Sequence, residues 1–197
     1  ATIESQSIGS TISNEMRSNA VKALIVACIF MLFYIWFRFK DIRFAGSAII
    51  ALVHDVLVML TGYALIRISV GNTFIACVLT IVGYSINDTI VIFDRIRENM
   101  QGMKKQTPET LAEVANRSLT QTLSRSLNTS ITTIIMVLLL FILGVSSIRE
   151  FALPLMIGLI SGTYSSIFIA AALWYVMKLH LGKDKLMKAA AAKTKKK

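Results

Sequence analysis

The stretch that decides the fold is Val82–Asn99, VGYSINDTIVIFDRIREN. It places Asn87 and Asp88 near the end of an otherwise apolar segment that is long enough to cross a membrane. A carboxylate in hydrocarbon is costly unless it is neutralised, paired or hydrated. We therefore interpret Asp88 as a residue that works on an ion, either a proton or Na⁺.

The composition agrees with a membrane protein. The chain has 197 residues, of which 55% are hydrophobic and 16% are charged, and its mean hydropathy is +0.66. Its apolar residues gather into five blocks, each close to the roughly 20 residues that a membrane-spanning helix needs. We predict an all-α integral membrane protein with five transmembrane helices, near residues 19–37, 44–66, 73–94, 127–146 and 152–179.

The positions of the basic residues predict an orientation. The net charge is +10, yet seventeen of the 21 Lys and Arg residues lie after the first block, after the third block or at the end of the chain. Only Arg17, Lys22, Arg67 and Arg149 lie on the other side. By the positive-inside rule the two basic loops and the C-terminus are cytoplasmic, and the N-terminus is outside. The charge thus reflects topology, and we expect no specific nucleic-acid partner.

Three regions follow from this topology. Residues 1–18 are polar and have no signal-peptide pattern, so an outside N-terminus predicts a membrane span upstream of them. Residues 19–182 form the transmembrane domain. Residues 183–197 form a basic cytoplasmic tail, which we interpret as a topological anchor, with binding to anionic lipid or to RNA at the ribosome surface as the alternative. Cys28 and Cys77 lie inside apolar blocks and are expected to be free thiols.

The loop after the third block contains a helix start. Thr107 and Pro108 have the pattern of an N-cap and a first helical residue, with Glu109 in the first turn. The apolar residues that follow recur at helical spacing. We predict an amphipathic helix at about 108–124, lying along the cytoplasmic surface.

Four ionisable residues lie within or at the edge of the apolar blocks. Asp55, next to His54, is twelve residues beyond Arg43, or about 18 Å along a helix, close to the membrane midplane. Asp88 lies about 9 Å deeper than Asp94, which is at the cytoplasmic edge. A carboxylate at such depth keeps its proton or shares an opposite charge, and both states are accessible when water enters. This is the chemistry of a proton relay.

Arg125 is the expected partner of Asp88, because it stays charged and its long stem reaches inward from the interface. The residues after it form a polar face that predicts a water-filled cavity beside the fourth block: Asn128, Thr129, Thr132 and Thr133. Structural alternatives remain for each of these residues. Asp88 suits a polar contact between helices, Arg125 suits a topological anchor, and His54 with Asp55 suits hydrogen bonds that hold helices together.

Other patterns exclude several functions. Gly158 and Gly162 form a small-xxx-small pattern, which indicates close helix packing. The sequence has no metal-ligand cluster, no Ser-His-Asp arrangement and no phosphate-binding glycine loop, so we expect no enzyme, no metal and no cofactor other than the coupling ion. Asp55 and Asp88 lack the Gly-x-Gly-Asp run that an intramembrane aspartyl protease needs.

Four motifs in order carry a resemblance to a known family: ALVHDV (51–56), VGYSINDTIVIFDRIREN (82–99), NRSLTQTLSRSLNTS (116–130) and GLISGTYSS (158–166). Together they resemble the SecF side of the SecD/SecF family of protein-export membrane proteins. The resemblance implies one half of a resistance-nodulation-division (RND) type transporter in the bacterial inner membrane. It also implies use of a proton gradient, or a sodium gradient in some relatives, to promote late steps of preprotein translocation.

The resemblance also implies partners and roles. The partners are a SecD-like subunit, the SecYEG channel, a YidC-type insertase and the translocating preprotein. By motif, Asp88 matches the intramembrane carboxylate of the family and Arg125 its intramembrane arginine, while Asp55 and Asp94 take supporting roles. The chain departs from a complete member in lacking the first span and the extracytoplasmic domain, of which residues 1–18 resemble the last strand or linker. A non-transporting assembly scaffold and an exporter of small molecules or lipids remain alternatives.

Overall fold

The structure is a computed structural model that describes residues 2–67, 72–101, 103 and 107–180. The helices are α1 (Thr2–Phe39), α2 (Ile42–Ile66), α3 (Asn72–Gln101), α4 (Pro108–Leu143) and α5 (Ser146–Tyr164). A π-helical stretch, η1 (Ser165–Ala170), continues α5, and the chain stays helical to His180. The described residues contain no strand, and five of their helical segments are long and apolar enough to cross a membrane. The predicted five-span, all-α fold is therefore confirmed, while the basic tail lies outside the described residues.

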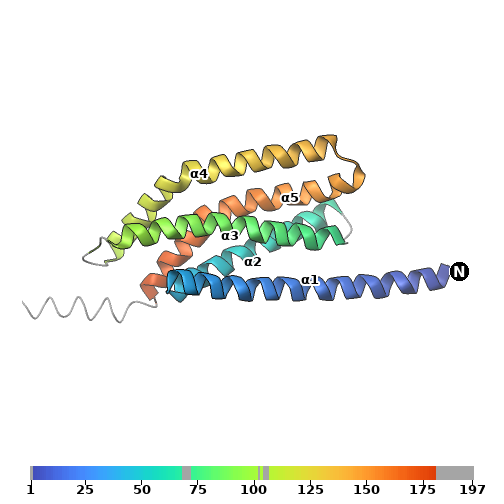
Figure 1. The fold of residues 1–197 in the computed structure, drawn as a ribbon, viewed down its shortest axis with the longest axis horizontal. Coiled ribbons are helices and arrows are strands. Elements are labelled where there is room, and N and C mark those ends of the chain that lie inside the picture. The colour runs from blue at the N-terminus through green and yellow to red at the C-terminus, as the bar shows by residue number, and fades with distance from the viewer. Residues whose placement is uncertain (1, 68–71, 102, 104–106, 181–197) are drawn as a thin grey trace, which may run out of the picture.

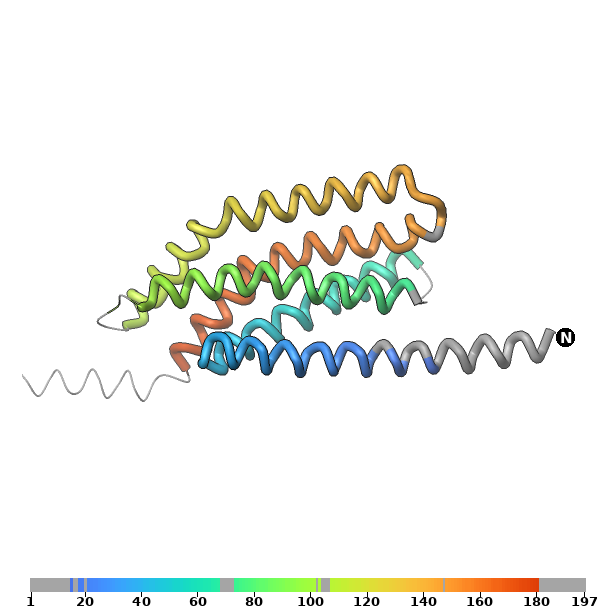
Figure 2. The backbone as a smooth tube through the Cα atoms, in the orientation of Figure 1, coloured from blue at the N-terminus to red at the C-terminus, as the bar shows by residue number. Residues whose placement is uncertain are grey.

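The helices form a bundle with α1 and α4 at opposite edges (Figure 1). α1 packs on α2 and α3, and α4 packs on α3 and α5. α5 lies in the middle and contacts α2, α3 and α4. The backbone trace shows that the α1–α2 turn, the start of α4 and the end of the last helix lie at one end of the bundle (Figure 2). The loops predicted to be cytoplasmic are thus at the same end of the molecule.

Two helix starts are fixed by side-chain caps. The Asp41 side chain accepts a hydrogen bond from the backbone N–H of Arg43 at the start of α2. At α4, Thr107 and Thr110 form a reciprocal capping box, and Pro108 occupies the first turn. The predicted N-cap at Thr107 is confirmed, because its hydroxyl satisfies a backbone N–H that would otherwise lack a partner.

Two segments differ from the sequence predictions. α4 runs without interruption for 36 residues, so the stretch 108–124 is not a separate surface helix. The reason is that no Gly or Pro occurs between Glu109 and Leu143, so nothing ends the helix where the apolar block begins. Residues 2–18 are helical and continue α1, in place of a strand or an extended linker, because helix growth from an existing span is easier than nucleation.

A polar layer separates two apolar clusters along the bundle axis. The first cluster lies toward the α1–α2 turn and is built around Phe44, Phe93 and Trp174, with the Phe44 and Trp174 rings stacked at 5.3 Å. The second cluster is built around Met59 and Ile81 among others. On α3, on α4 and on the last helix formed by α5 and η1, the buried polar residues come between the two clusters in sequence: Ser85 and Thr89, Ser118, Thr122, Ser126 and Ser130, and Ser161, Ser165 and Ser166. On α2, Asp55 lies beside Leu52 and Val56 of the second cluster, and the buried Ser47 lies within the first.

Two glycines let α5 approach α3. A Cβ on Gly158 would overlap the side chain of Ile81. A Cβ on Gly162 would lie 3.2 Å from the Cβ of Ser85. The small-xxx-small spacing thus brings α3 into close contact with the middle of α5, beside the polar layer.

Replacing Gly158 by Ala is expected to destabilise the protein by about 1–3 kcal/mol, because the added methyl group forces Ile81 out of its packed position. Gly83→Ala is the matched control, since a Cβ at Gly83 has no atom within 4 Å. Thermal unfolding of the purified complete protein in detergent measures both variants. Equal midpoints for the two variants would contradict the packing role of Gly158.

Candidate functional site

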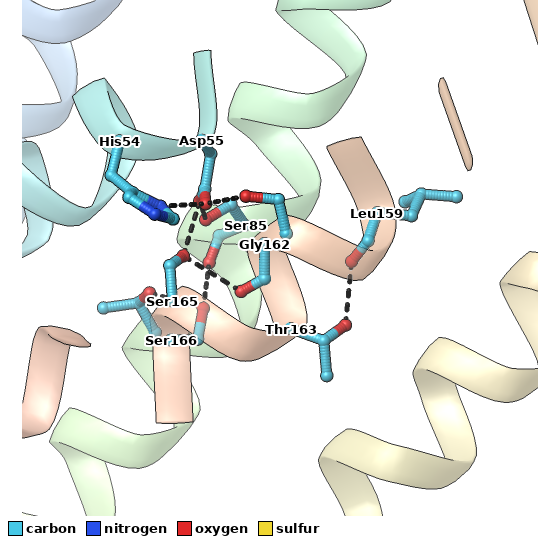
Figure 3. Close-up of polar contacts among 10 residues, drawn as sticks. His54, Asp55, Ser85, Leu159, Gly162, Thr163, Ser165 and Ser166 are labelled. Atoms are coloured by element: carbon cyan, nitrogen blue, oxygen red, sulfur yellow. Dashed lines mark hydrogen bonds and ion pairs between the residues drawn. The ribbon is translucent and has the colours of Figure 1, made fainter. Parts of the chain in front are cut away.

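Asp55 lies at the centre of the polar layer. It is 0% exposed, and three serine hydroxyls donate to its carboxylate (Figure 3). Ser85 of α3 and Ser165 of η1 each donate to Oδ2 at 2.6 Å, and Ser161 of α5 donates to Oδ1 at 2.9 Å. The carboxyl group therefore ties α3, α5 and η1 to α2 through three hydrogen bonds.

His54 is the other contact of this carboxylate. Its Nδ1 lies 3.2 Å from Asp55 Oδ1, and 36% of its side chain is exposed. The imidazole ring lies 6.5 Å from the ring of Tyr164, measured between centroids. His54 thus connects a fully buried carboxylate to the outer side of α2 and α5.

The π-helical stretch positions the serines. Ser161 and Ser165 are four residues apart and lie on one face of the helix, and Ser165 is the first residue of η1. Ser166 bonds the backbone oxygen of Ser85 at 3.2 Å and the hydroxyl of Thr89 at 2.9 Å. π-Helical turns are rare and are frequent at functional sites. Here the π-turn brings two consecutive serines, Ser165 and Ser166, onto α2 and α3.

Asp88 lies on a neighbouring face of α3 and contacts α4. Its Oδ1 accepts a hydrogen bond from Ser126 Oγ at 2.5 Å. Its Oδ2 is buried and has no hydrogen-bond partner among the described residues. A buried carboxylate oxygen without a donor is costly, so this oxygen is the natural place for a proton, a water molecule or a cation to bind.

A hydroxyl cluster lies one helical turn from Asp88. Tyr84 donates to Ser130 at 2.9 Å, and Ser130 lies 2.6 Å from the hydroxyl of Thr163. These contacts join α3, α4 and α5. The face of α4 that meets Asp88 is therefore the serine face formed by Ser126 and Ser130.

The residues predicted to surround Asp88 lie farther out. Arg125 is exposed and attracts the Asp88 carboxylate through space, but the two form no ion pair among the described contacts. Asn87 and Thr129 are exposed, and their side chains make no hydrogen bond within the described part of the chain. The direct contact expected between Asp88 and Arg125 is absent from this structure, because Arg125 projects from α4 one position before the buried Ser126.

Asp94 lies apart from the polar layer. It is at the basic end of α3, half exposed, and pairs with Arg38 of α1 at 2.9 Å and with Arg97 at 4.0 Å. Exposed pairs of this kind contribute little stability. Asp94 thus joins α3 to α1 and has no contact with Asp88.

Sequence reasoning missed the serine donors. It assigned no role to Ser85, Ser126, Ser161, Ser165 or Ser166. The available signal was the spacing: Ser161 and Ser165, like Ser126 and Ser130, are four residues apart on one helical face. Apolar residues around them gave no indication of which face turns inward.

Comparison with known proteins assigns the chain to a family. Residues 1–180 match the family described as protein export membrane protein SecD/SecF, C-terminal. The chain belongs to the SecD/SecF family. The resemblance found in the four sequence motifs is thereby confirmed.

Individual relatives agree with this assignment. The chain is 48% identical to the protein translocase subunit SecF of Alicyclobacillus acidocaldarius over 172 residues, which cover 87% of the chain and 56% of that protein. It is 42% identical to SecF of Vibrio alginolyticus over 91% of the chain and 55% of that protein. A crystal structure of SecDF in a super-membrane-facing form superposes with a TM-score of 0.78 at 44% identity, covering 90% of the chain and 23% of SecDF.

The chain spans about half the length of the SecF relatives that it matches and about a quarter of SecDF. The family and the five apolar helices confirm a multi-pass membrane protein of the bacterial inner membrane.

Replacing Ser126 by Ala should destabilise the protein by about 1–3 kcal/mol, because Asp88 then loses its hydrogen bond and has neither oxygen satisfied. The matched control is Ser124→Ala, an exposed serine on the same helix. Thermal unfolding at constant pH and salt compares the two. A Ser126→Ala variant as stable as the control would show that the hydrogen bond to Asp88 does not matter.

Proposed function

We propose that this chain is the membrane part of a SecF-type subunit that works with a SecD-like partner in protein export, powered by a proton or sodium gradient. Three things support the proposal: membership of the SecD/SecF family, five membrane-length helices, and one unsatisfied carboxylate oxygen inside them. The single observation that carries the ion-coupling role is Asp88 Oδ2, which is buried in a span and has no hydrogen-bond donor among the described residues. The chain acts as a transport subunit and not as an enzyme, with the coupling ion as its only small ligand.

The mechanism follows from the two charges. When Asp88 is ionised, it is attracted to Arg125, which stays charged at any working pH. When a proton or Na⁺ neutralises Asp88, that attraction is lost and only the hydrogen bond from Ser126 remains. Because Asp88 is on α3 and Arg125 is on α4, binding and release of the ion change the force between these two helices. Movement of α4 against α3 then passes to the parts of the protein outside the membrane.

The energy is sufficient for such a step. One proton that crosses 100 mV releases about 2.3 kcal/mol. This shifts a two-state equilibrium nearly fifty-fold, by about the Boltzmann factor of that energy. A few protons therefore drive a domain movement without ATP hydrolysis in this chain.

The proposed orientation places the α1–α2 turn, the start of α4 and the end of the last helix in the cytoplasm, with the N-terminus outside. This end carries Arg38, Arg43 and Arg97, as the positive-inside rule requires. We further propose the SecYEG channel, a YidC-type insertase and the preprotein as partners, and anionic lipid as the contact of the basic tail.

An assembly scaffold is the second candidate, and one observation favours it. The face of α4 with Arg125, Asn128 and Thr129 is exposed in this chain, as is Asn87 on α3. Polar side chains in a span need a partner or water, so this face suits contact with a SecD-like half. Contact with a SecD-like half is compatible with both the ion-coupling and the scaffold hypothesis, and mutation of Asp88 distinguishes between these two hypotheses. An exporter of small molecules or lipids is less well supported, because the relatives found are protein translocase subunits.

Asp88→Asn is expected to abolish ion-driven export by the complete complex and to leave assembly intact, because an amide has nearly the same shape but neither binds nor releases a proton. The measurement is preprotein translocation into inverted vesicles, with and without an ion gradient. Glu113→Gln, an exposed change on α4, is the matched control and should keep full activity.

Undiminished ion-driven export by the Asp88→Asn complex would refute the coupling role. Loss of co-purification with the SecD-like partner, before any loss of transport, would instead support the scaffold.

A further inference from the structure

Asp55 presents a problem of charge that the Asp88 mechanism does not address. Its carboxylate is completely buried, yet no Lys or Arg contacts it within the described part of the chain. Hydroxyl donors stabilise an anion but do not neutralise it. A buried charge without a counter-charge costs several kcal/mol, so the cluster needs one positive charge or one proton.

His54 is the group that can supply this positive charge or this proton. Its Nδ1 and Asp55 Oδ1 are 3.2 Å apart, a distance that suits a proton on either atom. With the proton on nitrogen, the pair is imidazolium and carboxylate. With the proton on oxygen, it is neutral imidazole and carboxyl, and no other covalent bond changes. In both cases the pair as a whole is neutral, whereas loss of the proton leaves one net negative charge buried.

No other described helix that packs near Asp55 offers a group in contact with it that could supply the positive charge in place of His54. On α5 the titratable neighbour is Tyr164, whose ring lies beside the imidazole. On α3 the charged residue in the middle of the span is Asp88, which is itself negative and contacts α4. The part of α1 between Lys22 and Arg38 has no charged residue, and η1 has no titratable residue.

Access to the pair is one-sided. Asp55 has no exposed surface, while 36% of the His54 side chain is exposed. A proton that reaches Asp55 therefore passes through the imidazole, which accepts at one nitrogen and delivers at the other.

We propose that His54 and Asp55 form a second proton-binding site, separate from Asp88, in which one proton is held between His54 Nδ1 and Asp55 Oδ1 and exchanges through the exposed side of the imidazole. The serines link this site to the fold. Ser161 and Ser165 hold α5 and η1 on Asp55 and donate most strongly to the ionised carboxylate. Protonation of the carboxyl weakens these bonds and loosens the π-helical stretch from α2.

The test uses the complete protein with its SecD-like partner in lipid vesicles. Histidine labelled with ¹⁵N reports the protonation of each imidazole, and infrared difference spectra between two pH values report protonated carboxyl groups. The His54 signal is the one that disappears in His54→Gln. His180→Gln, at the exposed end of the last helix, is the matched control and should leave that signal unchanged.

The expected result is that Asp55→Asn changes the His54 signal, because the imidazole loses its contact with the carboxyl group, or removes a carboxyl band that responds to pH. Either change supports the site. A His54 titration unaffected by Asp55→Asn, together with no carboxyl band that depends on Asp55, overturns it.

A second variant decides the question if the Asp55→Asn complex fails to assemble. Ser165→Ala removes one hydrogen bond from the carboxylate, so the proton should move toward the oxygen and the carboxyl band should strengthen. Ser47→Ala is the matched control, a buried serine on α2 that bonds only to backbone oxygens. Equal spectra for the two serine variants overturn the proposal. Because no readout depends on export, the result is independent of the Asp88 mechanism.

Discussion

The cost of a carboxylate inside hydrocarbon is the constraint on which this structure depends. Asp55 and Asp88 meet it in different ways. Asp55 accepts hydrogen bonds from three serines on three helical segments, contacts its own neighbour His54, and is sealed from the surface. Asp88 has one donor, Ser126, and one buried oxygen without a partner. The hydrogen bonds of Asp55 hold the helices together, and the unpaired oxygen of Asp88 is where the proposed coupling ion binds.

The packing of the bundle serves this polar layer. Apolar clusters lie on both sides of the layer, so its buried hydrogen bonds form in surroundings of low dielectric and are strengthened. Gly158 and Gly162 bring α5 against α3, and the π-helical stretch η1 then directs Ser165 and Ser166 at the neighbouring helices.

Much of the fold was predictable from the sequence, because hydrocarbon thickness fixes the length of a spanning helix and Thr107 with Pro108 has a clear capping pattern. The continuity of α4 could not be predicted from the sequence, because hydropathy changes at a membrane boundary whether or not the helix ends there. The places of Asp55 and Asp88 inside spanning helices followed from the hydropathy pattern. Their partners did not, since Ser85, Ser126 and Ser165 lie in apolar surroundings that leave the inward face undetermined. For Arg125 the error was of the opposite kind. Its charge suggested a direct contact with Asp88, but its position on α4 leaves it exposed.

The central claim is that Asp88 gains and loses a cation as helices α3 and α4 move. Ion flux through the complete protein, purified and reconstituted in liposomes under an imposed gradient, tests it most directly. The account predicts a flux that requires the carboxylate, falls to the level of empty liposomes when Asp88 is replaced by Asn, and persists when the exposed Glu113 is replaced by Gln. An unchanged flux through the Asp88 variant would contradict it.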